Sequence, residues 1–183
     1  MRQMRAVGIL TGVVLFAALV PSIACANPLE SGKPGSGDAA PLFSVEDIDG
    51  KKVALEQILK SGNAVLLNFW GLRCGNCIIE IGYLNPLHEK YAPAGAVFLG
   101  VNVDGAPAAM LNRLMPKMPN VPKYTVIPDP DMKIPDLYNL TGAPLSIIIG
   151  RDGKITWRHE DFKEGDEKEI ERALKEALAA KPR

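Results

Sequence analysis

The sequence AVLLNFWGLRCGNC, residues 64–77, places two cysteines directly after a long apolar run. Residues 64–70 are apolar except for Asn68, which is typical of a strand buried on both faces of a sheet. The helix predicted next begins at Cys74, and a helix N-terminus stabilises a thiolate through its free N–H groups and its dipole. Two residues separate Cys74 from Cys77, so the stretch predicts a strand–CxxC–helix centre for dithiol–disulfide exchange.

The rest of the chain predicts strands that alternate with helices and end in a hairpin and a helix. Two short strands flank Asp49-Gly50 within residues 42–55, and a helical turn follows at 56–60. Further elements are predicted as a helix at 74–91 that Pro86 kinks or splits, strands at 96–103, 124–127, 146–149 and 155–159, a helix at 107–115, a helical turn at 137–140, and a helix at 167–180 capped by Asp166. This order indicates a three-layer α/β sandwich around a mixed sheet.

The first 26 residues have the pattern of a secretory signal peptide. Arg2 and Arg5 precede an apolar stretch at residues 7–20, and Ala24-Cys25-Ala26 fits a cleavage site. The apolar stretch is short for a membrane span, which needs about 20 residues; a retained N-terminal membrane anchor and a lipid on Cys25 are the alternatives. Residues 27–40 are expected to form a flexible tether, and residues 41–183 a single domain.

Charge and cysteine content narrow the function. Without Arg2 and Arg5, 19 basic and 21 acidic residues remain, with no basic stripe that would indicate nucleic-acid binding. The chain has no second long apolar run of the kind that would indicate an integral membrane protein. Export exposes Cys74 and Cys77 to an oxidising compartment, where cysteines normally pair. Because a disulfide across two residues closes too small a loop to stabilise a fold much, a redox function is favoured over a structural one.

The spacing of the cysteines does not favour a metal or haem site. A four-ligand zinc site needs two more ligands, and His88 and His159 stand in no recognisable ligand pattern. Haem attachment needs a histidine directly after the second cysteine, where Ile78 stands. We therefore expect neither a metal nor a cofactor.

The order of elements resembles the thioredoxin fold, and the motifs resemble those of the exported TlpA/ResA-like thiol–disulfide oxidoreductases from about residue 41 to the end. The matching residues are LNFWG at 67–71, CGNC at 74–77, Glu80, VNVD at 101–104, GAP at 142–144, SIII at 146–149 and DGKI at 152–155. The resemblance implies a thioredoxin-like three-layer α/β/α sandwich with a mixed central sheet and an N-terminal β-hairpin. The chain departs from the family at Arg73, where an aromatic residue is usual, and at Gly75-Asn76, which lacks the usual proline or histidine.

The resemblance also implies roles for the residues around the thiols. Cys74 is expected to be the exposed nucleophile and Cys77 the buried resolving thiol. Glu80 is expected to tune the cysteine pKa values or to relay protons, with a solvated helix glutamate as the alternative. Asn68 stands where thioredoxin carries a buried aspartate, which leaves Glu80 as the expected ionisable group near the thiols.

Four residues are predicted to meet the partner. Pro144 is the candidate cis-proline, and the backbone of Ala143 is expected to pair with an extended partner segment. Arg73 is expected to favour the Cys74 thiolate and to change the surface that a partner meets. Trp70 is expected to shield the thiols, with core packing as a compatible alternative.

The function implied is that of a periplasmic enzyme that reduces disulfides of other exported proteins, with electrons from a membrane thiol reductase. Apocytochrome c, in cytochrome c maturation, is the best-known substrate of such relatives. Three alternatives stay open: a disulfide oxidant or isomerase, a peroxidase of the related peroxiredoxin group, and a copper-binding chaperone. The peroxidase needs a Pro and a Thr or Ser that residues 69–73 do not supply, and relatives that carry copper have a wider cysteine spacing.

Overall fold

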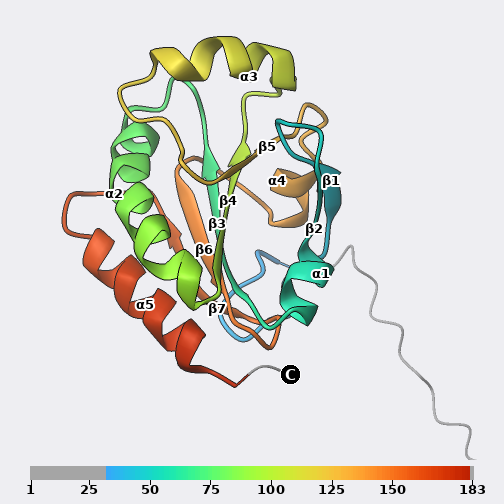
Figure 1. Ribbon diagram of the computed structural model, residues 1–183, viewed down its shortest axis with the longest axis vertical. Helices are drawn as coiled ribbons and strands as arrows, with labels where there is room; N and C mark the ends of the chain where they lie inside the picture. Colours follow the sequence, from blue (N-terminus) through green and yellow to red (C-terminus); the bar gives the residue numbers. More distant parts are fainter. Residues whose placement is uncertain (1–31, 182–183) are drawn as a thin grey trace, which may run out of the picture. The chain divides into compact units, whose positions relative to one another are not determined.

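Five strands form the central sheet of the computed structural model, which describes residues 32–181 (Figure 1). In sheet order they are β5 (Thr125–Pro128), β4 (Ala96–Asn102), β3 (Ala64–Trp70), β6 (Leu145–Ile149) and β7 (Ile155–Glu160). β3 pairs parallel with β4, and β4 with β5, whereas β6 runs antiparallel to both β3 and β7. The sheet is therefore mixed, as predicted. The predicted signal peptide, with Cys25, lies outside the described residues.

Helices cover both faces of this sheet. On one face lie α2 (Gly75–Tyr91) and α5 (Glu167–Ala179), and on the other lie α1 (Leu55–Lys60) and α4 (Lys133–Leu137) (Figure 1). α3 (Ala108–Leu114) lies at the end of the sheet where β3 meets α2 (Figure 1). Among residues 32–181, no helix combines the length and the apolar composition needed to cross a bilayer.

The alternation of β3 explains how the two layers are built. Val65, Leu67 and Phe69 pack with the residues of α1 and α4, whereas Leu66 packs with α2 and α5. Because successive side chains of a strand point to opposite faces, Asn68 and Trp70 share the α2 face with Leu66. All seven side chains of β3 are buried, as the apolar run predicted. This register places the polar Asn68 beneath the helix that carries the cysteines.

The predicted N-terminal hairpin is present as β1 (Ser44–Glu46) and β2 (Lys52–Ala54). Its turn uses Gly50, whose φ of 78° lies in the left-handed region that favours glycine. The Ile48 N–H donates to the Val126 carbonyl (2.9 Å), so the hairpin is joined to the edge strand β5.

Two predicted helices differ in part from those observed, and the N-cap of a third lacks its side-chain hydrogen bond. Of the two effects predicted for Pro86, a kink or a split, the split does not occur, because α2 is continuous through this residue. The helical turn predicted at residues 137–140 is instead α4 at Lys133–Leu137, because the Asp129 carboxylate accepts from the Ile134 N–H (2.6 Å) and starts the helix earlier. Asp166 is the N-cap residue of α5, as predicted, but its side chain makes no capping hydrogen bond: its Oδ2 accepts from the Lys163 N–H (2.8 Å) and lies 3.0 Å from His159 Nε2.

The described part of the predicted tether is bound to the domain. Around the start of β7, the Gly37 N–H donates to the Ile155 carbonyl (2.8 Å), the Ile155 N–H to Asp38, and the Ala40 N–H to Gly153. We call residues 33–40 the N-terminal strap. The prediction of a flexible tether over residues 27–40 is therefore wrong for the strap, since its backbone pairs with the edge strand.

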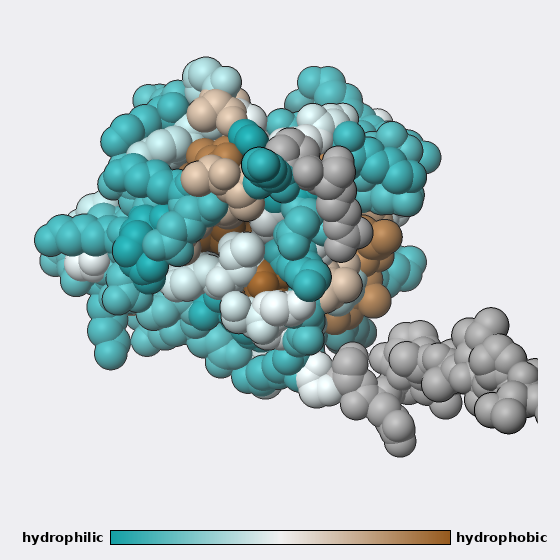
Figure 2. All heavy atoms as spheres, turned by 90° about the horizontal axis from the view of Figure 1, so that it is seen from below, coloured by the Kyte–Doolittle hydropathy of each residue, from teal (hydrophilic) through white to brown (hydrophobic). Residues whose placement is uncertain are grey.

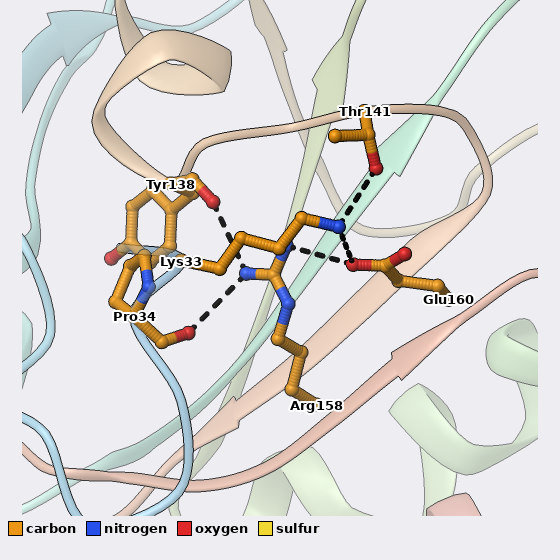
Figure 3. A network of polar contacts seen from close by, with 6 residues as sticks. All are labelled: Lys33, Pro34, Tyr138, Thr141, Arg158 and Glu160. Atoms are coloured by element: carbon orange, nitrogen blue, oxygen red, sulfur yellow. Dashed lines mark hydrogen bonds and ion pairs between the residues drawn. The ribbon is translucent and has the colours of Figure 1, made fainter. Parts of the chain in front are cut away.

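Side chains fix the start of the strap (Figure 3). Lys33 Nζ donates to Glu160 Oε1 (2.8 Å) and to Thr141 Oγ1 (3.0 Å). The Arg158 guanidinium donates to the carbonyl oxygens of Pro34 (3.4 Å) and Tyr138 (3.1 Å) and to Glu160. The strap is thereby tied to β7 and to the loop that precedes β6.

Candidate active site

The two cysteines lie where β3 ends and α2 begins, and they form a disulfide in this structure. Cys74 is the N-cap of α2, and the Cys77 N–H lies 3.2 Å from Cys74 Sγ. Cys77 has no exposed surface, whereas Cys74 is partly exposed. The unequal exposure fits the predicted roles, because only Cys74 is open to a partner.

The loop between β3 and the cysteines is held by Asp104. Its Oδ2 accepts from the Leu72 N–H (2.7 Å) and from Asn102 Nδ2 (2.7 Å). The Cys74 N–H then closes a turn onto the Gly71 carbonyl (3.2 Å). Asp104, just after the C-terminal end of β4, thus positions Cys74 by holding the loop that precedes this cysteine.

Glu80 lies on the buried side of α2, one turn after Cys77, and has no exposed surface. Its Oε1 accepts from Ser146 Oγ (2.7 Å) and its Oε2 from Asn68 Nδ2 (2.8 Å). The Tyr124 hydroxyl donates to Asn68 Oδ1 (3.2 Å) and completes the network. The alternative of a solvated glutamate is therefore wrong.

Burial raises the pKa of Glu80 from 4.5 to about 7. The hydrogen bonds from Ser146 and Asn68 favour the carboxylate and oppose this rise, while the negative charges of Asp166 and Asp161 add to it. Burial, with a smaller contribution from Glu80, also holds the pKa of Tyr124 well above its usual range. At neutral pH Glu80 thus exists in both protonation states, as a group that gives and accepts protons must.

Ser146 and Tyr124 are site residues that the sequence interpretation missed. Asn68 pairs with Ser146 in the β3–β6 register, so both side chains point to the α2 face. The sequence does contain a signal for this network, because β3 and β6 each carry one polar residue in an otherwise apolar strand. A buried polar side chain needs a hydrogen-bond partner, so two such residues can be expected to meet. The pairing of the two strands, which brings these residues together, spans 78 positions in sequence.

The loop before β6 faces the cysteines. The Ala143–Pro144 peptide bond is cis, as the resemblance implied, and the Ala143 carbonyl oxygen lies 3.6 Å from Cys74 Sγ. Asp161 links this loop to the helix: its N–H donates to the Pro144 carbonyl (2.9 Å), and its Oδ1 accepts from Asn76 Nδ2 (3.1 Å). Asn76 and Asp161 are further positioning residues that the sequence interpretation missed.

Two of the predicted partner-binding residues differ in exposure. Trp70 is fully buried and packs with Cys77 and Ile81, so its predicted place in the substrate-binding surface is wrong and core packing is correct. Arg73 is exposed next to Cys74. Its effect on the thiolate stays a prediction, because Cys74 is in a disulfide here.

Other features lie away from the thiols. A cavity of about 340 Å³ is lined by Ala40, Leu42 and Leu59 together with the β6–β7 turn. Figure 2 shows the molecule from below the view of Figure 1, with hydrophobic residues visible between hydrophilic ones and along one edge, at the right. In the described part of the chain, no three His, Cys, Asp or Glu residues are grouped so as to hold a metal ion.

Comparisons with known proteins agree with this geometry. The sequence profile of the AhpC/TSA family matches residues 36–158. A thiol-disulfide oxidoreductase ResA of Bacillus cereus is 33% identical over 147 residues, which cover 80% of this chain and 79% of that protein. ResA of Bacillus subtilis is 29% identical over 157 residues, 85% of either chain. A crystal structure of a putative thiol:disulfide interchange protein, DsbE from Chlorobium tepidum, superposes with a TM-score of 0.71 at 30% identity, over 80% of this chain and 99% of that one.

Proposed function

This chain belongs to the AhpC/TSA family and is a thioredoxin-like thiol–disulfide oxidoreductase, and we propose that it is exported to the periplasm and reduces disulfides of other exported proteins there. One observation carries the proposal: a partly exposed Cys74 stands before a buried Cys77, with the buried Glu80 carboxyl one helical turn further on. The exposed sulfur suits attack on a partner, and the buried sulfur suits intramolecular resolution.

The first step uses Cys74. In the reduced protein the Cys74 thiolate attacks one sulfur of the partner disulfide. The partner's S–S bond breaks, its second sulfur leaves as a thiolate, and Cys74 becomes joined to the partner in a mixed disulfide. The N-terminal end of α2 stabilises the attacking thiolate, because its free N–H groups and dipole favour negative charge.

The second step uses Cys77 and Glu80. A free thiol has a pKa of about 8.5, so Cys77 must lose a proton before it can attack. A carboxylate whose pKa is about 7 accepts that proton more readily than one at 4.5. The Cys77 thiolate then attacks Cys74 Sγ, the partner leaves as a thiolate with both electrons, and the protein is left with the Cys74–Cys77 disulfide.

Return to the reduced state requires an external dithiol. We propose that a membrane thiol reductase supplies those electrons, and that apocytochrome c is a partner whose cysteines are reduced before haem attachment. The names of the ResA and DsbE relatives state thiol–disulfide exchange, and the choice of these partners rests on the family resemblance.

Trapping of the mixed disulfide tests the proposed order of attack. Cys77→Ser keeps the nucleophile and lacks the resolving thiol, so it should accumulate a covalent complex with a disulfide-bonded partner such as insulin. Cys74→Ser is the matched control and should form no complex. Complexes formed through Cys77 alone would contradict the assignment.

The direction of electron flow is tested by the equilibrium reduction potential of Cys74–Cys77. A value near about −270 mV, that of thioredoxin, is expected for a reductant. A value near about −120 mV would instead identify an oxidant or isomerase. If no reversible disulfide forms and the protein binds copper(I) tightly, with affinity lost in His159→Ala, the chaperone alternative would replace the proposal.

A further inference from the structure

A groove lies beside Cys74, between the loop that joins β3 to α2 and the helix α3. Its volume is about 570 Å³. Its apolar lining comes from Leu72 and Ile78, which flank the cysteines, and from Met110, Leu114 and Met118, which belong to α3 and the segment that follows it. Met110 is 39% exposed, so apolar surface in this groove is open to solvent. Leu72 lies two residues before Cys74, and Ile78 directly follows Cys77. A partner segment bound in the groove would therefore lie next to the reacting sulfur of Cys74.

Two cations line the same groove. Arg73 and Lys117 are exposed, and neither has a carboxylate within ion-pair distance among the residues that the structure describes. Asp104 is the acidic residue of the lining, but its Oδ2 already accepts two hydrogen bonds of 2.7 Å, from the Leu72 N–H and Asn102 Nδ2. The groove therefore combines apolar side chains with two cations that are free of ion pairs and one carboxylate, so its lining has a net charge of +1.

We propose that this groove selects partner segments that carry an apolar side chain beside the reactive cysteine and an acidic side chain next to it. The proposal rests on the proposed function, whose substrate class it narrows. The apolar side chain removes Met110 and its neighbours from water, and the carboxylate pairs with Arg73 or Lys117. Water-exposed ion pairs are weak singly, so the selectivity depends on both cations acting together.

The test compares synthetic peptides that each contain one cysteine in a mixed disulfide with 2-mercaptoethanol. The central sequences are Glu-Leu-Cys-Leu-Glu, Lys-Leu-Cys-Leu-Lys and Glu-Ser-Cys-Ser-Glu, symmetric so that chain direction does not matter. The second-order rate constant for reduction by the reduced protein is measured for each. It is divided by the rate with free 2-mercaptoethanol, which removes the intrinsic reactivity of the peptide.

The wild type should reduce the Glu peptide about tenfold faster than the Lys peptide, with a ratio that falls as salt is added. In Arg73→Gln/Lys117→Gln this ratio should fall to about two or below. Any change in the Cys74 thiolate caused by loss of Arg73 affects both peptides and cancels in the ratio. Lys168→Gln, an exposed lysine of α5 outside the groove, should keep the wild-type ratio.

The apolar lining is tested by Met110→Gln, which should reduce the preference for the Leu peptide over the Ser peptide. Equal rates for the Glu and Lys peptides in the wild type, or a ratio that the double variant leaves unchanged, would overturn the groove proposal and leave the proposed function intact. Failure to reduce any peptide, and also 2-hydroxyethyl disulfide, would overturn the proposed function as well.

Discussion

Glu80 is a carboxyl group held without solvent contact between a strand and a helix. Its two oxygens are satisfied by Ser146 and Asn68, yet burial still raises its pKa to about 7. Hydrogen bonds therefore reduce the cost of the charge without removing it. A group in this state makes the stability of the protein depend on pH.

For the disulfide form, stability should fall as the pH rises from about 4.5 to about 7. In that window the unfolded chain has released the Glu80 proton while the folded protein still binds it, so a rising pH favours unfolding. The contribution is about 3 kcal/mol. Glu80→Gln should lack this decrease, as measured by urea unfolding at each pH.

Other groups also titrate in this range, so the informative quantity is the difference between wild type and variant. Glu169→Gln, which changes an exposed glutamate of α5, serves as the control and should follow the wild type. If the free energy of unfolding of Glu80→Gln changes with pH in parallel with the wild type, the pKa of Glu80 is not raised by folding.

Asp161 joins the cysteine helix to the loop of Pro144 from a left-handed backbone, with φ of 68°. Asp161→Ala removes the acceptor of Asn76 and Phe162 and places alanine in a conformation that it adopts poorly, so we expect a loss of about 2 kcal/mol. Asp161→Asn keeps an oxygen acceptor and tolerates this φ, and should lose less than half as much. Thermal or urea unfolding separates the two, and equal losses would mean that the charge itself matters.

At the scale of elements, α2 is constrained where it passes Asn120. A Cβ on Gly82 would lie 2.8 Å from Asn120 Nδ2, which donates to the Ile78 carbonyl (2.9 Å). Gly82→Ala should therefore destabilise the protein by about 1 kcal/mol despite the higher helix propensity of alanine.

A double-mutant cycle checks this cause. In an Asn120→Ala background the obstructing amide is absent, so Gly82→Ala should become neutral or stabilising in urea unfolding. A loss of the same size in both backgrounds would place the cause elsewhere than at Asn120.

The elements that were predicted correctly are those whose type and position follow from the pattern of their own residues. The apolar run of β3, the Asp49-Gly50 turn and the amphipathic α5 depend on local pattern, and the structure confirms all three. α4 was misplaced because it starts where Asp129 accepts from Ile134, a contact that periodicity does not show. The composition of the strap predicts a flexible loop, because its pairing with β7 is a long-range contact that composition does not show.

The site residues likewise divide into those that local motifs predict and those that depend on long-range strand pairing. Cys74, Cys77 and Pro144 stand in recognisable motifs. The Ser146 and Tyr124 contributions to the Glu80 network depend on strand register and on the β4–β5 pairing, which one sequence does not reveal. The burial of Trp70 follows from the inward register of β3 and was available as the alternative interpretation.

For the whole molecule, both edge strands of the sheet are joined to N-terminal segments. The strap pairs with β7, and Ile48 of the hairpin donates to Val126 of β5. An uncovered edge strand offers its backbone to other chains and promotes association. We therefore expect the strap to reduce association as well as to stabilise the fold.

A chain that starts at residue 41 should be less stable than one that starts at residue 32, by about 1–3 kcal/mol, because it loses the backbone hydrogen bonds of the strap. It should also associate at concentrations where the longer chain stays monomeric, as measured by light scattering. Lys33→Ala in the longer chain is the control: it removes an exposed ion pair with Glu160 and an exposed hydrogen bond to Thr141 but no backbone pairing, and should cost less than about 1 kcal/mol. Equal stability of the two chains would show that the strap contributes nothing to folding.

The burial of Trp70 beside Cys77 has an optical consequence. An excited indole transfers an electron to a neighbouring disulfide, which quenches its emission, and two thiols quench it less. Trp70 lies in apolar surroundings and should emit at short wavelength, while the partly exposed Trp157, stacked on His159 with ring centroids 5.2 Å apart, should emit further to the red. The short-wavelength component should therefore brighten when Cys74–Cys77 is reduced, so that turnover can be followed in real time without a label.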